Sequence, residues 1–463
     1  MRHMPIVIAA VCLLVTGLAV PLNAEPSEDR GPCGQITAAC RGAGFRLGGA
    51  GTGTGLLADC IVPIMQGTPQ PRRARNSLPH VDPQLVADCK ASNPRFGQMN
   101  TPPSELASPA REAPQPTIAP QSQAFSAGIG QPCASTEDGR PSGLAVVLAS
   151  GLGRGIDRRD QYLQALNNPF ISGVAVQINW RDIEPVQGKP DWSKLDELFA
   201  AAESSKKWVH LAIFPGFFSP EWALEGAKTD LFAIPYGPGH GTEAKLPMPW
   251  DRVYLNRWFA FVRQVGDRYE KSPAFRIIAA GGPTSVSEET TLPSSPPAMQ
   301  KLVRDGYTLD KYLGAWEETF HVYAQASPNQ CVSLATGKRN IAIVERAMRV
   351  LIRRLAIQMS DLHAGRAEVE APDNTEFIKG YSGRIITGFE MRGGSQGLIP
   401  SKIMGAEGDP PLALRRSIDK GMAPNKAGRR INYLEIYMGD VLPAEMQPVL
   451  QYAASLFRGS APR

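Results

Sequence analysis

The sequence predicts an α/β chain that ends in a (β/α)₈ barrel, preceded by a small cysteine-rich module and a proline-rich linker. After residue 142, apolar runs typical of β-strands alternate with helical patterns, which is typical of parallel β/α units. Eight such runs occur, and eight parallel strands close a barrel. The remaining ~320 residues fit a barrel with long loops, since ~250 residues is the usual length before insertions.

The eight predicted strands span residues 144–149, 173–179, 208–214, 276–280, 331–336, 356–360, 384–390 and 431–437. Helical patterns lie between or after them, at 192–203, 253–269, 309–326, 341–354 and 444–457. In the helix at 253–269, the apolar residues recur on one face, including Tyr254, Trp258 and Phe261. The connection between the seventh and eighth strands shows no evident long helix, so we expect an irregular element there.

Composition favours a globular chain that does not bind nucleic acid. The 463 residues are 43% hydrophobic and 20% charged, with a formal net charge of +5. The lysines and arginines are scattered, whereas a phosphate-binding surface needs a concentrated stripe. We therefore expect no nucleic-acid partner.

The first 24 residues have the three-part layout of a secretory signal peptide. Arg2 and His3 precede an apolar run at 6–20, and Ala24 ends a small-residue cleavage site. The run is shorter than the ~20 residues of a membrane span, and an uncleaved anchor is the alternative. We expect a secreted or periplasmic protein with no integral membrane segment after cleavage at residue 24.

The cysteines predict disulfides in a separate amino-terminal module. Of seven cysteines, one lies in the signal peptide, and the other six are Cys33, Cys40, Cys60, Cys89, Cys133 and Cys331. An even number of cysteines in an exported chain favours disulfides. A zinc site would favour close C-x-x-C spacings, and the chain has none. The pairing stays open. The module is expected at 25–100, a Pro/Ser/Gln-rich linker at 101–132 and the barrel at 133–463.

Acidic residues recur where predicted strands end, which is the edge where barrel enzymes place their working groups. Glu390 ends the seventh strand, and Glu288 and Glu289 lie in the loop after the fourth. Two carboxyl groups at one edge suit glycoside hydrolysis, in which one protonates the leaving oxygen and the other attacks. We assign Glu390 as nucleophile and favour Glu289 as the acid, with Glu288 second. Alternatively, Glu390 pairs with Arg392, and Glu288 and Glu289 are solvated loop residues.

Aromatic and polar residues at the same edge are candidates for binding substrate. Sugars present apolar faces to aromatic rings, so the candidates are Trp180, Asp182, Trp222, Trp250, Glu435 and Tyr437. Any single tryptophan is more often part of a core, and Arg181 and Asp182 can form a local pair. His210, inside the third strand, fits an interior side chain better than a base. Asp361 and His363 match no metal motif, and we predict neither metal nor cofactor.

One segment resembles a known family. The run INWRDIEPVQGKPDWSKLDELFAAAE, at 178–203, resembles the segment W-x-x-(I/L)-E-P-x-x-G-x-(Y/P)-D-(W/F)-x-x-L-D after the second strand of clan A glycoside hydrolases, such as bacterial β-galactosidase-type and cellulase-type barrels. The resemblance covers residues 144–460. It implies an acid/base after strand four and a nucleophile at the end of strand seven, which correspond to Glu289 and Glu390. The clan usually has Asn-Glu at the tip of strand four, whereas this chain has Gly281 to Thr284 there and its acids later.

The leading hypothesis is an exported retaining glycoside hydrolase acting on an oligo- or polysaccharide. The first alternative is a non-catalytic carbohydrate-binding or envelope-interaction protein on a degenerate glycosidase barrel, which the missing Asn-Glu motivates. The second is a different barrel enzyme with Glu435 as its working group. A serine hydrolase fits less well, because the chain has no G-x-S-x-G motif.

Overall fold

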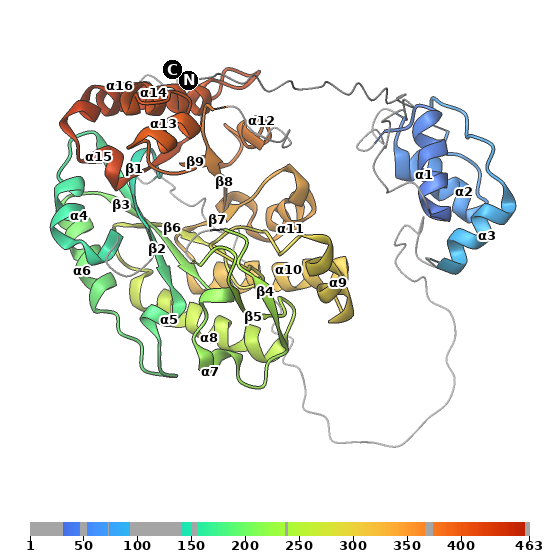
Figure 1. Ribbon diagram of the computed structural model, residues 1–463, viewed down its shortest axis with the longest axis horizontal. Helices are drawn as coiled ribbons and strands as arrows, with labels where there is room; N and C mark the ends of the chain where they lie inside the picture. The colour runs from blue at the N-terminus through green and yellow to red at the C-terminus, as the bar shows by residue number, and fades with distance from the viewer. Residues whose placement is uncertain are drawn as a thin grey trace, which may run out of the picture. The chain divides into compact units, whose positions relative to one another are not determined.

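The computed structural model describes residues 31–46, 53–72, 74–92, 140–149, 155–236, 239–365 and 374–458. The chain divides into two compact units, within residues 1–122 and 123–463 (Figure 1). The predicted signal peptide and linker lie outside the described residues. Within those residues, no helix has the length and apolar character needed to cross a membrane.

The amino-terminal unit is a helical module held by two disulfides. It contains α1 (Pro32–Gly42), η3 (Leu56–Ile61), α2 (Val62–Gln66) and α3 (Pro83–Ser92). Disulfides join Cys33 to Cys89 and Cys40 to Cys60. The predicted disulfides are confirmed here, and Cys331 is also disulfide-bonded. Cys133 lies outside the described residues. The module's core is small, so the cross-links must supply much of its stability.

The second unit is a closed barrel of eight parallel strands (Figure 1). They are β1 (Gly143–Leu148), β2 (Ile171–Asn179), β3 (Trp208–Phe214), β6 (Phe275–Ala279), β7 (Cys331–Ala335), β8 (Leu355–Leu362), β9 (Ile386–Met391) and β10 (Tyr433–Tyr437). They follow one another around the barrel in chain order, and β10 closes it against β1. Each overlaps one predicted strand, and the predicted fold class is confirmed.

Helices connect the strands and cover the barrel. The longer ones are α4 (Arg159–Leu166), α6 (Ser193–Ser204), α8 (Arg252–Tyr269), α9 (Pro296–Arg304), α10 (Leu309–Ala326), α11 (Ile341–Leu351), α14 (Pro410–Met422) and α16 (Gln447–Arg458). Short ones are η5 (Gly155–Asp157), α5 (Trp180–Ile183), η6 (Gly216–Phe218), α7 (Glu221–Leu224), η7 (Lys338–Asn340), η8 (Ile352–Arg354), α12 (Asn374–Lys379), α13 (Leu398–Met404), α15 (Met438–Val441) and η9 (Ala444–Met446). Outward strand residues such as Val176, Leu211 and Ile357 pack against them in one large core.

The expectation of no long helix between the last two strands is wrong. Helix α14 lies there, with 13 residues. Asp409 caps its start by accepting from the backbone N–H of Leu412, and Pro410 follows at the first helical position, where proline is favoured. Leu414, Ile418 and Met422 are buried at four-residue intervals. That spacing is helical, but charged residues between these positions made the apolar stripe hard to recognise in the sequence.

Inward strand residues alternate with the outward ones and fill the barrel. At the amino-terminal end they form a mostly apolar layer: Ala145, Trp208, Ile277, Cys331, Ala356, Ile386 and Tyr433. Large rings fit because glycines face them. A β-carbon at Gly388 would lie 2.2 Å from the ring of Tyr433, and one at Gly173 would lie 2.3 Å from the ring of Trp208. Above this layer the interior becomes polar.

A hairpin is inserted between β3 and α8. Strands β4 (Thr229–Ala233) and β5 (Glu243–Pro247) pair antiparallel. Phe232 and Leu246 of the hairpin pack with Phe214 and Val286 in a second core at the carboxyl end of the barrel. The hairpin therefore covers part of that end.

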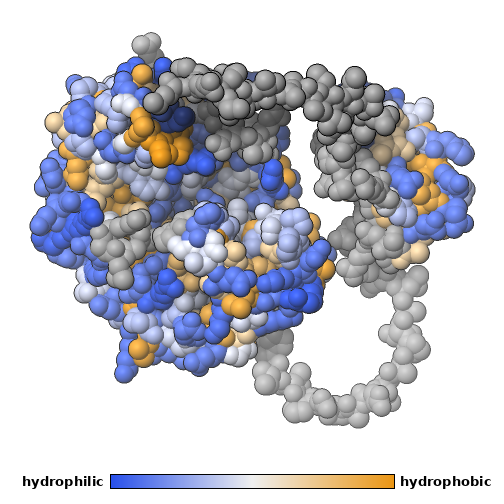
Figure 2. All heavy atoms as spheres, viewed as in Figure 1, coloured by the Kyte–Doolittle hydropathy of each residue, from blue (hydrophilic) through white to orange (hydrophobic). Residues whose placement is uncertain are grey.

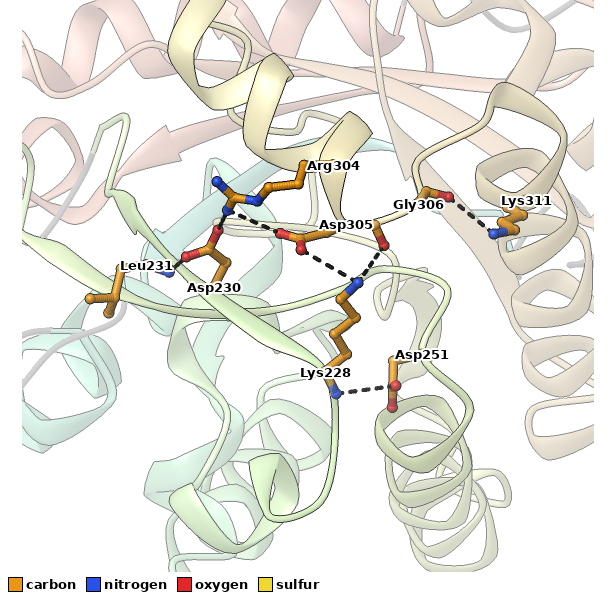
Figure 3. Close-up of polar contacts among 8 residues, drawn as sticks. All are labelled: Lys228, Asp230, Leu231, Asp251, Arg304, Asp305, Gly306 and Lys311. Carbon is orange, nitrogen blue, oxygen red and sulfur yellow. Dashed lines mark hydrogen bonds and ion pairs between the residues drawn. The ribbon is translucent and has the colours of Figure 1, made fainter.

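Polar contacts on the outer side of the hairpin hold it to the helices (Figure 3). Asp230 pairs with Arg304 of α9, and Lys228 Nζ lies 3.4 Å from Oδ1 of Asp305. The backbone N–H of Lys228 donates to Asp251, the residue that caps α8. Partly exposed pairs contribute ~0–1 kcal/mol each, so their main effect is to fix the position of the hairpin.

The viewed face of the barrel unit is mostly hydrophilic (Figure 2). An apolar patch is visible over α13 and α14, where Leu398, Ile399, Ile403 and Leu412 are exposed. Single exposed aliphatic residues occur elsewhere and need no special explanation.

We predict that replacing both Cys40 and Cys60 by serine unfolds the amino-terminal module. A bridge that closes 20 residues stabilises the folded state by about 3 kcal/mol in the chain-entropy model, and the small core has little reserve. Limited proteolysis with mass spectrometry should show new cleavage within 31–92, with the barrel's thermal transition unchanged. Unaltered protease resistance of the module would contradict this.

Candidate active site

A cavity of about 680 Å³ lies at the carboxyl ends of the barrel strands. Among the residues that line it are Gln177, Glu288, Glu289, Ser360, Glu390 and Tyr437. They come from β2, β8, β9, β10 and the loop after β6, so elements far apart in the sequence meet here. Four carboxyl groups line this one cavity, those of Glu288, Glu289, Asp361 and Glu390, and they are the main feature of the site.

Glu390 is held near the end of β9 by two hydrogen-bond donors. Its side chain is 2% exposed. Oε1 accepts from Nε2 of Gln177 at 2.9 Å and from the hydroxyl of Tyr437 at 2.7 Å. Tyr437 ends the adjacent strand β10 and Gln177 lies on β2, three strands away around the barrel, so the carboxyl group is held from two directions. Arg392, the alternative partner that the sequence offered, instead lies 3.6 Å from Asp361.

The loop after β6 brings Glu288 into the cavity. Ser287, with a φ of 56°, turns the chain just before it, and Glu289 then bridges to Ala335 of β7. The backbone N–H of Thr290 donates to the carbonyl of Ala335 at 3.0 Å. Glu288 is 2% exposed, and its Oε1 accepts from Ser360 at 3.3 Å. Its Oε2 is buried with no hydrogen-bond partner among the described residues.

The strand tip before this loop has no space for an acidic side chain. The indole of Trp258 donates to the carbonyl of Gly281 at 2.7 Å. The backbone N–H of Gly281 donates to the hydroxyl of Tyr323. A β-carbon at Gly282 would lie 2.8 Å from the ring of Trp258. Packing of α8 and α10 against the tip therefore explains why the acids follow later in the chain.

Glu289 also lines the cavity, but it is held by the inserted hairpin. Its Oε2 accepts from the hydroxyl of Tyr236 at 2.8 Å. Tyr236 in turn lies 3.0 Å from Oγ1 of Thr291. The hairpin thus fixes Glu289, whereas Glu288 contacts Ser360 of β8.

Burial raises the proton affinity of these acids. It raises the pKa of Glu288 to about 7, with further increases from Glu289 and Glu435. The pKa of Glu390 lies well above its usual range because of burial, then because of Glu288 and Glu435, although its two donors oppose the rise. Burial also raises the pKa of Glu289, and Tyr236 opposes it. Because Glu288 and Glu390 repel each other's charge, their protons leave in two steps that belong to the pair.

Glu435 does not line the cavity and contacts His210. It is 1% exposed, and its Oε1 lies 2.6 Å from Nδ1 of His210. Nε2 of that ring lies 2.8 Å from Oγ of Ser333. His210 is therefore an interior side chain with both ring nitrogens bonded. Glu435 and Tyr437, grouped together from the sequence, lie in different surroundings, since only Tyr437 lines the cavity.

The predicted tryptophan platforms and Asp182 do not line the cavity. Trp180 is fully buried and packs edge-on against Trp222 at 5.4 Å. Trp250 packs beside Tyr307. Asp182 is exposed and accepts from Asn179 at 2.7 Å. The aromatic rings that line the cavity are instead Phe214, Phe218, Tyr236 and Tyr437.

The sequence reading missed several polar groups of the site. Gln177 interrupts an apolar strand, VAVQIN, and that interruption was a usable signal. Ser360 and Tyr236 carried no signal, because their roles depend on how the loop and hairpin fold. Across the described ranges, no group of three His, Cys, Asp or Glu side chains could hold a metal ion.

No protein-family model matches the chain, and no curated protein matches its sequence. Similar solved structures include a β-galactosidase from the psychrophilic Marinomonas ef1, at 13% identity and a TM-score of 0.42, covering 68% of this chain and 59% of that one. A cold-adapted β-galactosidase from Rahnella sp. R3 has 10% identity and a TM-score of 0.48, with 72% and 58% covered.

Xylanase 10B from Thermotoga maritima has 10% identity and a TM-score of 0.43, with 68% and 95% covered. The chain spans less than two thirds of the length of either β-galactosidase. Similarity at this level concerns the general fold and does not indicate an activity.

We predict that Glu288→Gln stabilises the protein at pH 8. Because the pKa of Glu288 is raised from 4.5 to about 7 in the folded state, ionising it costs stability as pH rises through this range. The variant should gain on the order of 3 kcal/mol at pH 8 and almost nothing at pH 4. Thermal unfolding at both values tests this, with the exposed Glu225→Gln as control. An equal gain at both values would contradict the prediction.

Proposed function

We propose that this chain is a glycoside hydrolase of the retaining type, with Glu390 as nucleophile and Glu288 as acid/base. The observation that carries the proposal is a pair of buried carboxyl groups, on β9 and on the loop after β6, that line one cavity and repel each other's charge. Retaining glycosidases use two carboxyl groups across the scissile bond, one protonated and one ionised.

The surroundings of the two acids favour different roles. Gln177 and Tyr437 both donate to Glu390, which favours its ionised form, as a nucleophile requires. Glu288 has one oxygen without a partner among the described residues and a pKa of about 7. A carboxyl group that stays protonated near neutral pH can donate to a leaving oxygen. Glu289, the acid favoured by sequence, is occupied by Tyr236, so we prefer Glu288.

The reaction then has two steps. Glu288 protonates the glycosidic oxygen as the Glu390 carboxylate attacks the anomeric carbon, and the C–O bond to the leaving group breaks. In the second step Glu288, now ionised, takes a proton from water, which attacks the anomeric carbon and releases Glu390. The aromatic rings of the cavity, including Phe214, Phe218 and Tyr236, offer apolar contacts for an oligo- or polysaccharide.

We further propose that the protein works outside the cytoplasm, in the periplasm or secreted. The bridges Cys33–Cys89 and Cys40–Cys60 support an oxidising compartment. The signal-like sequence at residues 1–24 supports export.

Replacing the acids one at a time tests the proposed roles. Glu390→Gln should abolish turnover of aryl glycosides. Glu288→Gln should slow substrates with poor leaving groups by ~10²–10⁴-fold, and far less those with dinitrophenolate, which needs no protonation. Azide should rescue Glu288→Ala and yield a glycosyl azide of retained configuration. Glu289→Gln is the matched control for the neighbouring carboxyl.

Two outcomes would reject these assignments. If Glu289→Gln rather than Glu288→Gln shows the leaving-group dependence, the acid is Glu289. If the unaltered protein turns over no glycoside but binds glycans, and binding survives loss of Glu390 and Glu288, the non-catalytic alternative replaces the enzyme. The missing acid at the tip of β6, where Gly282 faces Trp258, is the observation that keeps this alternative open.

We predict that kcat/KM falls as pH rises through about 7. Glu288 must be protonated to act as acid, and its pKa of about 7 in the folded protein places the loss of that proton there. The acidic limb should lie above pH 4.5, since the pKa of Glu390 is raised. Rates on an aryl glycoside with a poor leaving group, which must be protonated as it departs, measure both limbs across pH 4–9. Glu288→Gln should lack the alkaline limb, and its persistence would contradict the assignment.

A further inference from the structure

The barrel interior holds three buried carboxyl groups close to one imidazole. Glu435 and Glu390 occupy matching register positions on the adjacent strands β10 and β9. Glu288 reaches the same region from its loop, and its pKa responds to the charges of Glu435 and His210 as well as to burial. Three adjacent carboxyl groups that are each 1–2% exposed would be too costly to ionise together. Some of their charge must be neutralised by protons or by a cation.

His210 is the basic side chain in contact with this cluster. Among the described residues, His210 and Glu435 form the contact between a basic side chain and these carboxyl groups, and it is an ion pair if the ring is protonated. The ring lies between Glu435 of β10 and Ser333 of β7, at 2.6 Å and 2.8 Å. Tyr433 is a further titratable group facing it, with ring centres 6.3 Å apart. The register neighbours from β2 and β6, Ala175 and Ile277, carry no charge.

The order Ser333, His210, Glu435 matches that of a serine hydrolase, but the burial excludes that chemistry. Ser333 is 1% exposed and does not line the cavity. A nucleophile must reach the carbonyl of its substrate. These residues therefore influence the site through charge and position, not through contact with substrate.

Three protonation states fit the distances. In the first, His210 is neutral, donates to Glu435 and accepts from the hydroxyl of Ser333, which leaves the pair with one negative charge. In the second, His210 is an imidazolium that donates from both nitrogens, and the pair is neutral. In the third, Glu435 is protonated and donates to a neutral ring, and the pair is again neutral. Of the two neutral states we favour the second, because an imidazole is ordinarily a stronger base than a carboxylate. An added negative charge beside Glu288 and Glu390 would hold both of them protonated, and the proposed reaction needs one of them ionised.

We propose that His210 is a positioning residue held as an imidazolium between Glu435 and Ser333, where its charge cancels that of Glu435 and leaves Glu288 and Glu390 to share a single proton. The inference rests on the proposed function of that pair. Glu435 and His210 take no part in bond making. They set the number of protons that the two working acids hold at a given pH.

Carboxyl titration tests the proposal without turnover. In the full chain with ¹³C-labelled glutamate carboxyls, Glu288→Gln and Glu390→Gln identify the two signals. His210→Gln should shift both titration steps of the pair upward by about one pH unit, since it leaves Glu435 uncompensated. Glu435→Gln should shift them downward by a similar amount, since it leaves the imidazolium unpaired. The double variant should return them close to their original values.

Opposite shifts are the signature of charge, because loss of packing alone does not change sign between the two variants. Shifts of the same sign, or none, would overturn the proposal. If a variant does not fold, ¹⁵N spectra of the unaltered protein decide: both ring nitrogens of His210 should be protonated at pH 6–7, and an unprotonated nitrogen would overturn it. Activity is not a readout here, so failure of the glycosidase assays would reject the proposed function separately.

Discussion

The candidate active site depends on the placement of carboxyl groups that are almost fully buried inside the barrel. A buried charge is tolerated only where donors or an opposite charge surround it. Glu390 has two donors, Gln177 and Tyr437, and Glu435 has the imidazole of His210. Glu288 accepts one hydrogen bond, from Ser360 at 3.3 Å. The ionised form of Glu390 therefore has more hydrogen-bond support than that of Glu288.

The barrel was predictable because its signal is local and repeated. Each strand is a short apolar run with turn residues around it, and alternation with helical stripes fixes the parallel arrangement. Helix α14 was missed although Leu414, Ile418 and Met422 have helical spacing, since charged residues dilute the stripe. The inserted hairpin was also missed, because its strands are short and their pairing is set by contacts with the barrel end.

The site was predictable in part, and the limit is again physical. A carboxyl at the end of a strand, such as Glu390, is placed by the strand itself, so sequence position suffices. Glu288 and Glu289 are placed by a loop that bridges to Ala335, and their side chains contact different partners, Ser360 and Tyr236. Trp180 and Trp222 lie near strand ends in sequence, yet their rings pack together in the helix layer. Side-chain direction, which short motifs do not encode, made the difference.

The bridge between Glu289 and Ala335 also affects how the site can change during evolution. Glu390 moves only if the barrel moves, but Glu288 is carried by a loop anchored at β6 and at Ala335 of β7. Insertion or deletion of a residue between these anchors would relocate the acid without disturbing the strands. The proposed nucleophile and the proposed acid therefore lie on parts of the chain that can change separately. Such a division lets a lineage explore new substrates, or lose catalysis, while the scaffold remains intact.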